Sequence, residues 1–231
     1  MVKVLNVVKK YGDLIALDHL SFDIQKGIIF GLLGVNGAGK STILSVLNGL
    51  SPIESGDIEV FGLNIRKDIE KIKQISSIIP QNLAFYDKLS VQENLEFFGK
   101  IQNATKENYA KAIEINGLSE VLKQRASTLS GGQKRRLNIA IGLLNDPKII
   151  YFDEPTVGID TKSRNEILNS IKSYKDFGTT VVYTSHYLNE IEFICDEVAI
   201  LSHGKLVTQE RVSEAGNLEK QFLELTGNQD D

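Results

Sequence analysis

Apolar runs and segments of helical periodicity alternate along most of this chain. Residues 28–33, 149–152 and 180–184 are mostly apolar, and the shorter stretch 75–80 resembles them. Short, uninterrupted apolar runs are typical of strands that are buried on both faces of a parallel sheet. Between them, apolar residues recur at helical spacing, for example Ile43, Leu44 and Leu47. The pattern predicts an α/β fold built on a mainly parallel sheet with helices on both faces.

The remaining segments depart from this alternation and suggest how the domain is organised. Phe22 and Ile24 alternate with polar residues, as in an antiparallel strand layer. Further along, Ser90 and Glu93 have capping-box spacing and open a helix-rich stretch. At 231 residues the chain is long enough for one domain with an embedded subdomain. We expect an antiparallel layer at residues 1–27 and an alternating core at residues 28–82 and 147–210. A helical insert would occupy residues 83–146, and a short closing helix would occupy residues 211–231.

A glycine-rich loop follows the first apolar run and precedes the first helical pattern. It reads Gly34-Val35-Asn36-Gly37-Ala38-Gly39-Lys40-Ser41, with Thr42 next. Glycines let the backbone wrap a phosphate group, and the helix N-terminus faces the anion. Lys40 is expected to reach the β- and γ-phosphates, Ser41 to ligate Mg²⁺, and Thr42 to add a phosphate contact. The alternative is a glycine-rich turn with a surface lysine. It is disfavoured because such a turn would not require the strand before it and the helix after it.

Two acids end the apolar run 149–152. Asp153 and Glu154 are placed at the carboxyl edge of a parallel sheet, where ligands bind in open α/β folds. Asp153 suits Mg²⁺ coordination, and Glu154 suits acceptance of a proton from an attacking water. Alone, such a pair is more often a solvated strand end, but the upstream phosphate loop favours the functional interpretation.

A second glycine-rich stretch precedes the helical pattern that extends to about Leu144. Ser130 and Gln133 have capping-box spacing around Gly131 and Gly132. A helix N-terminus with two glycines and a hydroxyl is suited to an anion such as a γ-phosphate. A well-capped surface helix fits these four residues equally well. One nucleotide site has no use for a second such motif, so we expect it to complete a site on another chain.

With these motifs in this order, nearly the whole chain resembles the ATP-binding cassette (ABC) ATPases. The resemblance implies that Tyr11 stacks on adenine and that Gln81 senses Mg²⁺ and water. It also places Asp160 in the dimer-interface loop and His186 at the γ-phosphate and the catalytic water. Outside the family context these residues would be read as an ordinary turn aromatic, strand-end amide, loop acid and helix-cap histidine. Ile159, Thr161 and the Tyr151-Phe152 pair depart from the usual family residues without removing a functional group.

The resemblance also implies the assembly. Two chains, in a homodimer or a heterodimer with a second ABC ATPase, would hold two ATP molecules head to tail. The insert 83–146 would carry the signature motif and receive an integral membrane permease subunit. An aromatic group could line that docking groove, although aromatics at such spacing are usually core; it consists of Phe85, Tyr86, Phe97 and Phe98.

Composition is compatible with such a subunit. The formal net charge of −4 and the lack of a Lys/Arg cluster argue against a general nucleic-acid-binding surface. No apolar run approaches the roughly 18 residues needed to span a bilayer, and Lys3, Lys9 and Lys10 interrupt any N-terminal signal peptide. The single cysteine, Cys195, is interpreted as a packed thiol. We expect a cytoplasmic protein that is peripheral on the inner face of the cell membrane through its permease.

Two of the histidines match no motif. His19 has no assigned role, and His203-Gly204 predicts a hairpin turn.

The segments around residues 134–137, 152–164 and 218–223 resemble the exporter branch that handles drugs, antibiotics, lipids or polysaccharides. A soluble ABC ATPase of translation, DNA repair or cofactor assembly is the alternative, although the chain has neither a second cassette nor zinc-binding cysteines. A regulator without turnover is disfavoured because Glu154 and His186 are both present.

Overall fold

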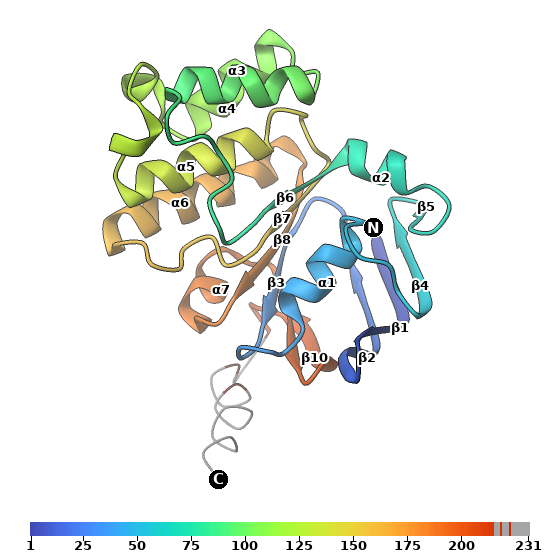
Figure 1. The fold of residues 1–231 in the computed structure, drawn as a ribbon. Helices are drawn as coiled ribbons and strands as arrows, with labels where there is room; N and C mark the ends of the chain where they lie inside the picture. Colours follow the sequence, from blue (N-terminus) through green and yellow to red (C-terminus); the bar gives the residue numbers. More distant parts are fainter. Residues whose placement is uncertain (215–217, 219–221, 223–231) are drawn as a thin grey trace.

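The computed structural model describes residues 1–214, 218 and 222 (Figure 1). Two sheets and a set of helices account for most of these residues. The strands are β1 (Val2–Tyr11), β2 (Leu14–Ile24), β3 (Ile29–Leu33), β4 (Ser55–Val60), β5 (Leu63–Asn64), β6 (Ser76–Ile79), β7 (Ile149–Phe152), β8 (Thr180–Ser185), β9 (Glu197–Ser202) and β10 (Lys205–Arg211). The α-helices are α1 (Lys40–Leu47), α2 (Ile69–Ile75), α3 (Val91–Ile101), α4 (Lys106–Ile115), α5 (Gly131–Gly142), α6 (Thr161–Ser173) and α7 (Leu188–Ile194). Three 3₁₀ turns, η1 (Ser119–Val121), η2 (Ala126–Thr128) and η3 (Tyr174–Phe177), complete the elements.

The larger sheet confirms the predicted α/β fold. Its strand order is β10-β9-β3-β8-β7-β6. Every neighbouring pair is parallel except β9 with β10, which form an antiparallel hairpin at one edge. The carboxyl ends of β3, β6, β7 and β8 therefore meet at one edge of the sheet. The glycine-rich loop, Gln81, the two acids and His186 follow these four strand ends.

The second sheet is antiparallel, as predicted for the N-terminal segment, but it is larger than expected. Its order is β2-β1-β4-β5. Strands β4 and β5 fall in residues 28–82, which the sequence assigned to the alternating core, so that assignment was wrong for them. β4 pairs with β1, with Val4 opposite Ile58. Val4 and Ile58 are both fully buried, which allows β4 to extend the antiparallel layer instead of the parallel one.

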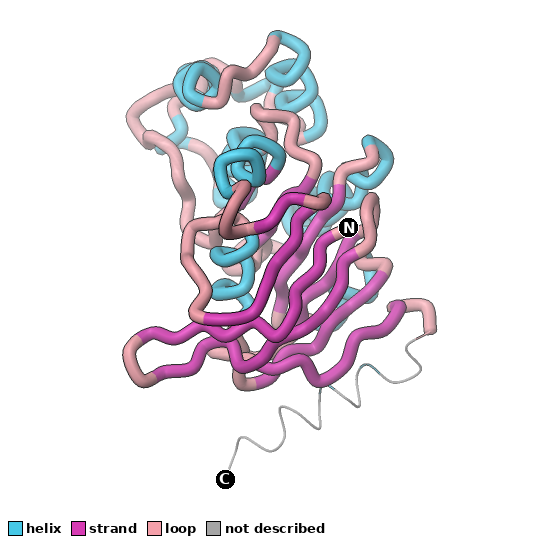
Figure 2. Tube along the Cα trace, turned by 90° about the vertical axis from the view of Figure 1, so that its right-hand side faces the viewer, coloured by secondary structure: helices cyan, strands magenta, loops and turns pink. Residues whose placement is uncertain are grey.

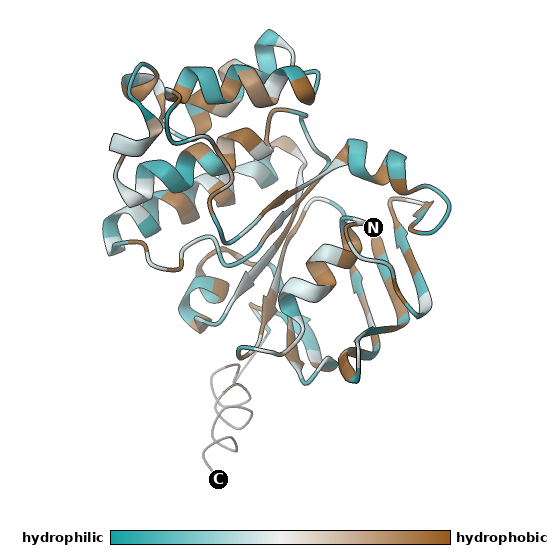
Figure 3. Cartoon of the chain, viewed as in Figure 1, coloured by the Kyte–Doolittle hydropathy of each residue, from teal (hydrophilic) through white to brown (hydrophobic). Residues whose placement is uncertain are grey.

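Buried side chains fill both faces of the six-stranded sheet. Along β7, Ile149 and Tyr151 pack toward α1 and the antiparallel sheet, whereas Ile150 and Phe152 pack toward α6 and α7. This alternation buries every residue of the strand, which explains the unbroken apolar runs. Figure 3 shows the hydrophobic colours along these strands, and Figure 1 shows α1 between the two sheets and α5 and α6 on the opposite side.

Helices α3, α4 and α5 share a hydrophobic cluster of their own that includes Leu95, Ala112 and Leu137. Figure 1 shows α3 and α4 at the end of the molecule farthest from the strands, which is also uppermost in Figure 2, whereas α5 lies between them and the sheet and contacts β6. The capping box at the start of α3 is present: the Ser90 hydroxyl accepts from the Glu93 amide, and the Glu93 carboxylate accepts from the Ser90 amide. The capped N-terminus and the apolar stripe together specify this helix.

The aromatic group of the insert is divided between core and surface. Phe85 and Phe98 are half-buried against the helical cluster, which agrees with the core alternative for these two residues. Tyr86 and Phe97 are 51% and 41% exposed, and their rings meet edge to face at 5.0 Å. An exposed aromatic pair therefore remains beside the half-buried residues.

Other local predictions can also be compared with the structure. The hairpin at His203-Gly204 is confirmed between β9 and β10. Cys195 is free and buried, and burial raises the pKa of its thiol well above the usual value, which agrees with a packed thiol. The closing helix predicted at residues 211–231 lies outside the described residues apart from residues 211–214, 218 and 222, and Arg211 is the last residue of β10. In the part of the chain that is described, no helix combines the length and apolarity needed to cross a membrane.

Candidate active site

The glycine-rich loop folds tightly between β3 and α1. A side chain could not be added at Gly34 or Gly39 without a collision, because a Cβ atom would lie 2.6 Å from the Leu201 carbonyl oxygen or 2.8 Å from the Ala16 carbonyl oxygen. The Lys40 ammonium group donates to the carbonyl oxygens of Gly34 (2.7 Å) and Val35 (3.1 Å). The loop is thus closed on itself, with a buried cation at the start of α1.

The two acids after β7 contact different parts of this loop. The Ser41 hydroxyl donates to Asp153 Oδ1 at 2.9 Å. Burial raises the pKa of the Asp153 carboxyl above its usual value, and hydrogen bonds from Ser41 and Thr184 oppose the rise. Glu154 Oε1 lies 3.2 Å from Lys40 Nζ, and its Oε2 lies 3.5 Å from His186 Nδ1. A carboxylate between a lysine and a histidine is placed to exchange a proton with a bound water.

Thr184, which the sequence named only as the end of a strand, holds both acids in place. Glu154 has a φ of +45°, an unusual backbone conformation for a residue with a side chain. Its amide donates to Thr184 Oγ1 at 2.9 Å, and that hydroxyl lies 3.1 Å from Asp153 Oδ1. Such backbone strain costs about 1–3 kcal/mol and persists where the surroundings over-determine it. No sequence pattern indicated Thr184, because its contacts depend on the parallel register of β7 and β8, which places Phe152 opposite Tyr183.

These groups line one hollow of about 640 Å³. Its lining includes Tyr11, the half-exposed last residue of β1, together with the loop, Gln81, Glu154 and His186. The sequence-predicted residues that line it are Tyr11, Asn36, Gly37, Gly39, Lys40, Ser41, Thr42, Gln81, Glu154 and His186. Asp153 lies directly behind Ser41, and the buried Ala38 forms the floor of the loop. A hollow lined by an aromatic side chain and a cationic phosphate loop has the features of a nucleotide site.

The second glycine-rich motif lies outside this hollow. The Ser130 hydroxyl accepts from the Gln133 amide at 3.3 Å, and Gln133 Oε1 accepts from the Ser130 amide at 2.9 Å, so the capping box is confirmed. Ser130 and Gly131 are exposed. A Cβ at Gly132 would lie 2.3 Å from Ser163 Oγ, so only glycine allows this approach of α5 to α6. The motif therefore presents a free helix N-terminus that its own chain's site does not use.

Asp160 stands beside this motif and caps the neighbouring helix. Its carboxylate accepts from the Ser163 amide at 3.0 Å, and this hydrogen bond is the main reason that the pKa of Asp160 is lowered. The N-termini of α5 and α6 thus lie side by side, in contact through Gly132 and Ser163. Like Ser130, Asp160 is exposed and does not line the hollow.

Arg135 connects the two regions and was missed as a functional residue. Its guanidinium group, on the first turns of α5, donates to the carbonyl oxygens of Pro80 and Gln81. The side chain is almost fully buried, and this burial lowers the pKa of Arg135. Arg135 therefore links the backbone at Gln81 to α5, whose N-cap is Ser130.

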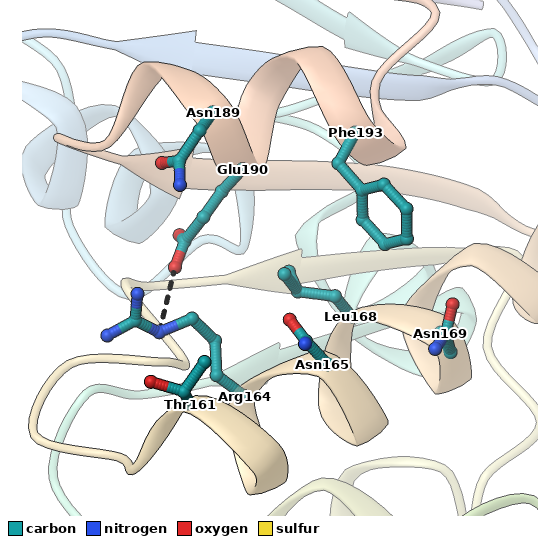
Figure 4. Close-up of a pocket in the computed structure, with 8 residues that line it drawn as sticks. All are labelled: Thr161, Arg164, Asn165, Leu168, Asn169, Asn189, Glu190 and Phe193. Carbon is teal, nitrogen blue, oxygen red and sulfur yellow. Dashed lines mark ion pairs between the residues drawn. The ribbon is translucent and has the colours of Figure 1, made fainter.

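A second hollow, of about 360 Å³, lies between α6 and α7 (Figure 4). On its wall Arg164 Nε approaches Glu190 Oε1 at 3.7 Å. Glu190 is buried and also accepts hydrogen bonds from the hydroxyl groups of Thr156, Tyr183 and Ser185 at 2.8 Å each. This carboxylate joins the segment after Glu154 to the strand and helix that flank His186.

Replacing Glu190 with Ala is expected to lower the free energy of unfolding by about 3 kcal/mol, because buried hydroxyl groups lose their acceptor and Arg164 loses its partner. Glu192→Ala is the matched control: this exposed residue of the same helix should change stability by no more than about 0.5 kcal/mol. Urea-induced unfolding of both variants measures the difference. Equal stabilities would show that the Glu190 network contributes nothing to the fold.

The phosphate loop and the paired acids at the carboxyl edge of a parallel sheet define a P-loop nucleotide hydrolase. Residues 17–157 match the ABC transporter family, and the chain belongs to it. The linearmycin resistance ATP-binding protein LnrL of Bacillus subtilis is 45% identical over 211 residues, which are 90% of this chain and 68% of that protein. The doxorubicin resistance ATP-binding protein DrrA of Mycobacterium tuberculosis is 33% identical over 93% of this chain and 67% of that protein.

A solved structure supports the same conclusion. The dimeric structure of a post-hydrolysis state of the ATP-binding cassette MJ0796, bound to ADP and Pi, matches with a TM-score of 0.81 at 26% identity. The match covers 92% of this chain and 99% of that one. The protein is an ATP-hydrolysing subunit of an ABC transporter and is similar to exporter-type cassettes.

Proposed function

We propose that two cassettes bind two ATP molecules between them, hydrolyse the nucleotide with the help of Mg²⁺, and so drive a separate membrane-spanning subunit that exports drugs or antibiotics. The observation that carries this proposal is the separation of two half-sites on one chain. The hollow contains Lys40, Glu154 and His186, while the exposed start of α5 at Ser130 lies outside it. A head-to-tail pair of chains would bring each half-site to its complement.

Within one half-site, the residues divide the work by position. Tyr11 would stack on the base, and the loop residues 36–42 would surround the phosphates with amide and ammonium donors. Glu154 would accept a proton from the attacking water, and His186 would orient that water against the γ-phosphate. The strained backbone at Glu154 fixes the direction of its carboxylate.

The oxygen donors beside the loop fit Mg²⁺. Ser41 Oγ and Asp153 Oδ1 are 2.9 Å apart, and Gln81 faces the same hollow. Hydroxyl, carboxylate and amide oxygens are the hard ligands that this cation prefers. When bound, Mg²⁺ would neutralise charge on the β- and γ-phosphates. Ser41, Gln81 and Asp153 are therefore the proposed metal-binding residues.

The opposite half of each site would come from the partner chain through the signature residues Ser130, Gly131, Gly132 and Gln133, with Asp160 at the same interface. The helix N-terminus that they form would bind the γ-phosphate of the nucleotide held by the first chain. Hydrolysis removes the bond between that phosphate and the opposing helix, so the dimer would open. The matched MJ0796 cassettes are dimers. A homodimer and a heterodimer both satisfy this geometry.

We further propose residues 83–146 as the helical subdomain that contacts an integral membrane permease, with the chain peripheral on the inner face of the membrane. The exposed pair Tyr86 and Phe97 supports this assignment, because neighbouring exposed aromatics mark contact surfaces. The resistance functions in the names of LnrL and DrrA favour antibiotics or drugs as the exported class. No nucleic-acid partner is proposed.

Tyr86→Asp and Phe97→Asp are each expected to reduce co-purification of the membrane subunit at least about tenfold, because a charge at the centre of an apolar contact costs more than 1.4 kcal/mol. Phe177→Asp is the matched control, since Phe177 is also exposed but belongs to η3. The measurement is recovery of the membrane protein from detergent-solubilised membranes, with melting temperature and ATP binding checked first. Well-folded variants that keep their membrane partner would refute this surface, and recovery of ribosomes, DNA or assembly factors without a membrane protein would favour the soluble alternative.

A further inference from the structure

His203 occupies a position that its local backbone does not favour. His203 and Gly204 form the two-residue turn of the β9–β10 hairpin, in which Ser202 pairs with Lys205. Their φ angles are +47° and +74°. Two consecutive positive φ angles are the signature of a type I′ turn, in which Asn-Gly, Asp-Gly or Gly-Gly is preferred. The requirements of the turn therefore do not explain the imidazole.

The tip of this hairpin is fixed against the nucleotide-binding loop. The Gly204 amide donates to the Ala38 carbonyl oxygen at 3.1 Å, and the Gly204 carbonyl oxygen accepts from the Asp18 amide at 2.9 Å. A Cβ on Gly204 would lie 2.6 Å from the Ala16 carbonyl oxygen. The turn is thus held between the phosphate loop and β2, so the backbone of His203 is fixed beside the site.

His203 lines the 640 Å³ hollow together with Tyr11, Ala16 and Gly39. Tyr11 is the residue proposed to stack on the base, and Gly39 belongs to the loop for the phosphates. A nucleotide that spans the two must place its ribose and α-phosphate between them, because these groups connect the base to the β-phosphate. Among the described residues that line the hollow, His203 and His186 are the histidines, and His186 lies beside Glu154.

We propose that His203 is a nucleotide-binding residue, with an imidazole N–H that donates a hydrogen bond to the ribose–α-phosphate portion of ATP or ADP. An imidazole always has at least one N–H donor, and both ribose hydroxyl groups and phosphate oxygens accept. This contact rests on the proposed placement of the nucleotide in the hollow. It adds a binding residue that the family motifs of the sequence do not include.

The test uses two substitutions that suit the turn, His203→Asn and His203→Gly. Both residues adopt positive φ in type I′ turns more readily than His, so the hairpin should be kept. His19→Gly is the matched control: His19 also has a positive φ, of +52°, and an exposed imidazole, but it does not line the hollow. Melting temperatures establish that all three variants fold.

Calorimetric titration with ATP, ADP and 2′-deoxy-ATP measures the contact. Both His203 variants should raise Kd for ATP and ADP about five- to tenfold, the effect of one hydrogen bond, while His19→Gly leaves Kd unchanged. Steady-state assays should show the loss in KM with kcat nearly unchanged, because the contact is remote from the γ-phosphate. If the variants lose affinity for ATP but not for 2′-deoxy-ATP, the acceptor is the ribose 2′-hydroxyl; equal losses assign it to the 3′-hydroxyl or the α-phosphate.

Wild-type Kd values in both folded His203 variants would overturn the proposal. Lys40→Ala separates this failure from failure of the proposed site. If Lys40→Ala weakens nucleotide binding and the His203 variants do not, only the role of His203 is wrong. If Lys40→Ala also binds normally, the nucleotide does not occupy this hollow, and the proposed function itself falls.

Discussion

Replacing Glu154 with Gln is expected to lower steady-state ATP turnover by on the order of a hundredfold or more. Glutamine keeps the size of the side chain and an oxygen that can face Lys40, 3.2 Å from Oε1 in the structure. It cannot accept a proton from water. Because the left-handed backbone at residue 154 is held by Thr184 and not by the carboxylate, the local fold should be retained.

The same variant should still bind ATP and should accumulate as an ATP-bound dimer, since hydrolysis is what would open the interface. Phosphate release, nucleotide binding and gel filtration with ATP measure the three properties. Glu192→Gln, which changes an exposed residue, controls for the loss of one negative charge. Near-normal turnover in Glu154→Gln would remove this carboxylate from the mechanism.

Ser130→Arg is expected to abolish hydrolysis while leaving the binding of ATP to Lys40 of the same chain intact. Ser130 is exposed and lies outside the hollow, so the added bulk and charge should affect only a partner that docks on this surface. The substitution also removes the hydroxyl that caps α5, which costs about 1 kcal/mol of stability. Ser130→Ala, which loses the cap without adding bulk, measures that part separately.

Mixing Ser130→Arg with Lys40→Ala chains tests the shared geometry. A heterodimer of the two contains one site with both halves intact and one with both halves damaged. ATPase activity of the mixture above that of either variant alone is the expected result. A mixture that stays inactive, in a dimer whose formation is verified by cross-linking, would contradict independent composite sites.

Local sequence signals predicted the parts of the site that depend on neighbouring residues. The capping boxes at Ser90 and Ser130 and the turn at His203-Gly204 all appear in the structure. Each depends on hydrogen bonds or φ angles within about four residues, so the sequence contains all the groups involved. The buried strand 149–152 was equally clear, because burial on both faces requires an unbroken apolar run.

Residues that act at long range were not predictable in this way. Thr184 contacts Asp153, Arg135 reaches Gln81 and Glu190 binds Thr156, yet each pair is separated by 31 residues or more. A threonine, an arginine or a glutamate in an ordinary helix or strand gives no pattern of its own. The sequence also did not decide that Tyr86 is exposed and Phe85 half-buried, because an aromatic side chain is compatible with a core position or a surface position.

The sequence by itself determined the α/β fold, the phosphate loop, the paired acids and the helix N-terminus at Ser130, because glycine spacing, capping and apolar runs are local properties of the chain. The tertiary structure alone decided that β4 joins the antiparallel sheet, that Thr184 positions both acids, and that His203 lines the hollow. The physical reason is that these contacts depend on strand order and register, which bring distant segments together only after the buried faces have packed.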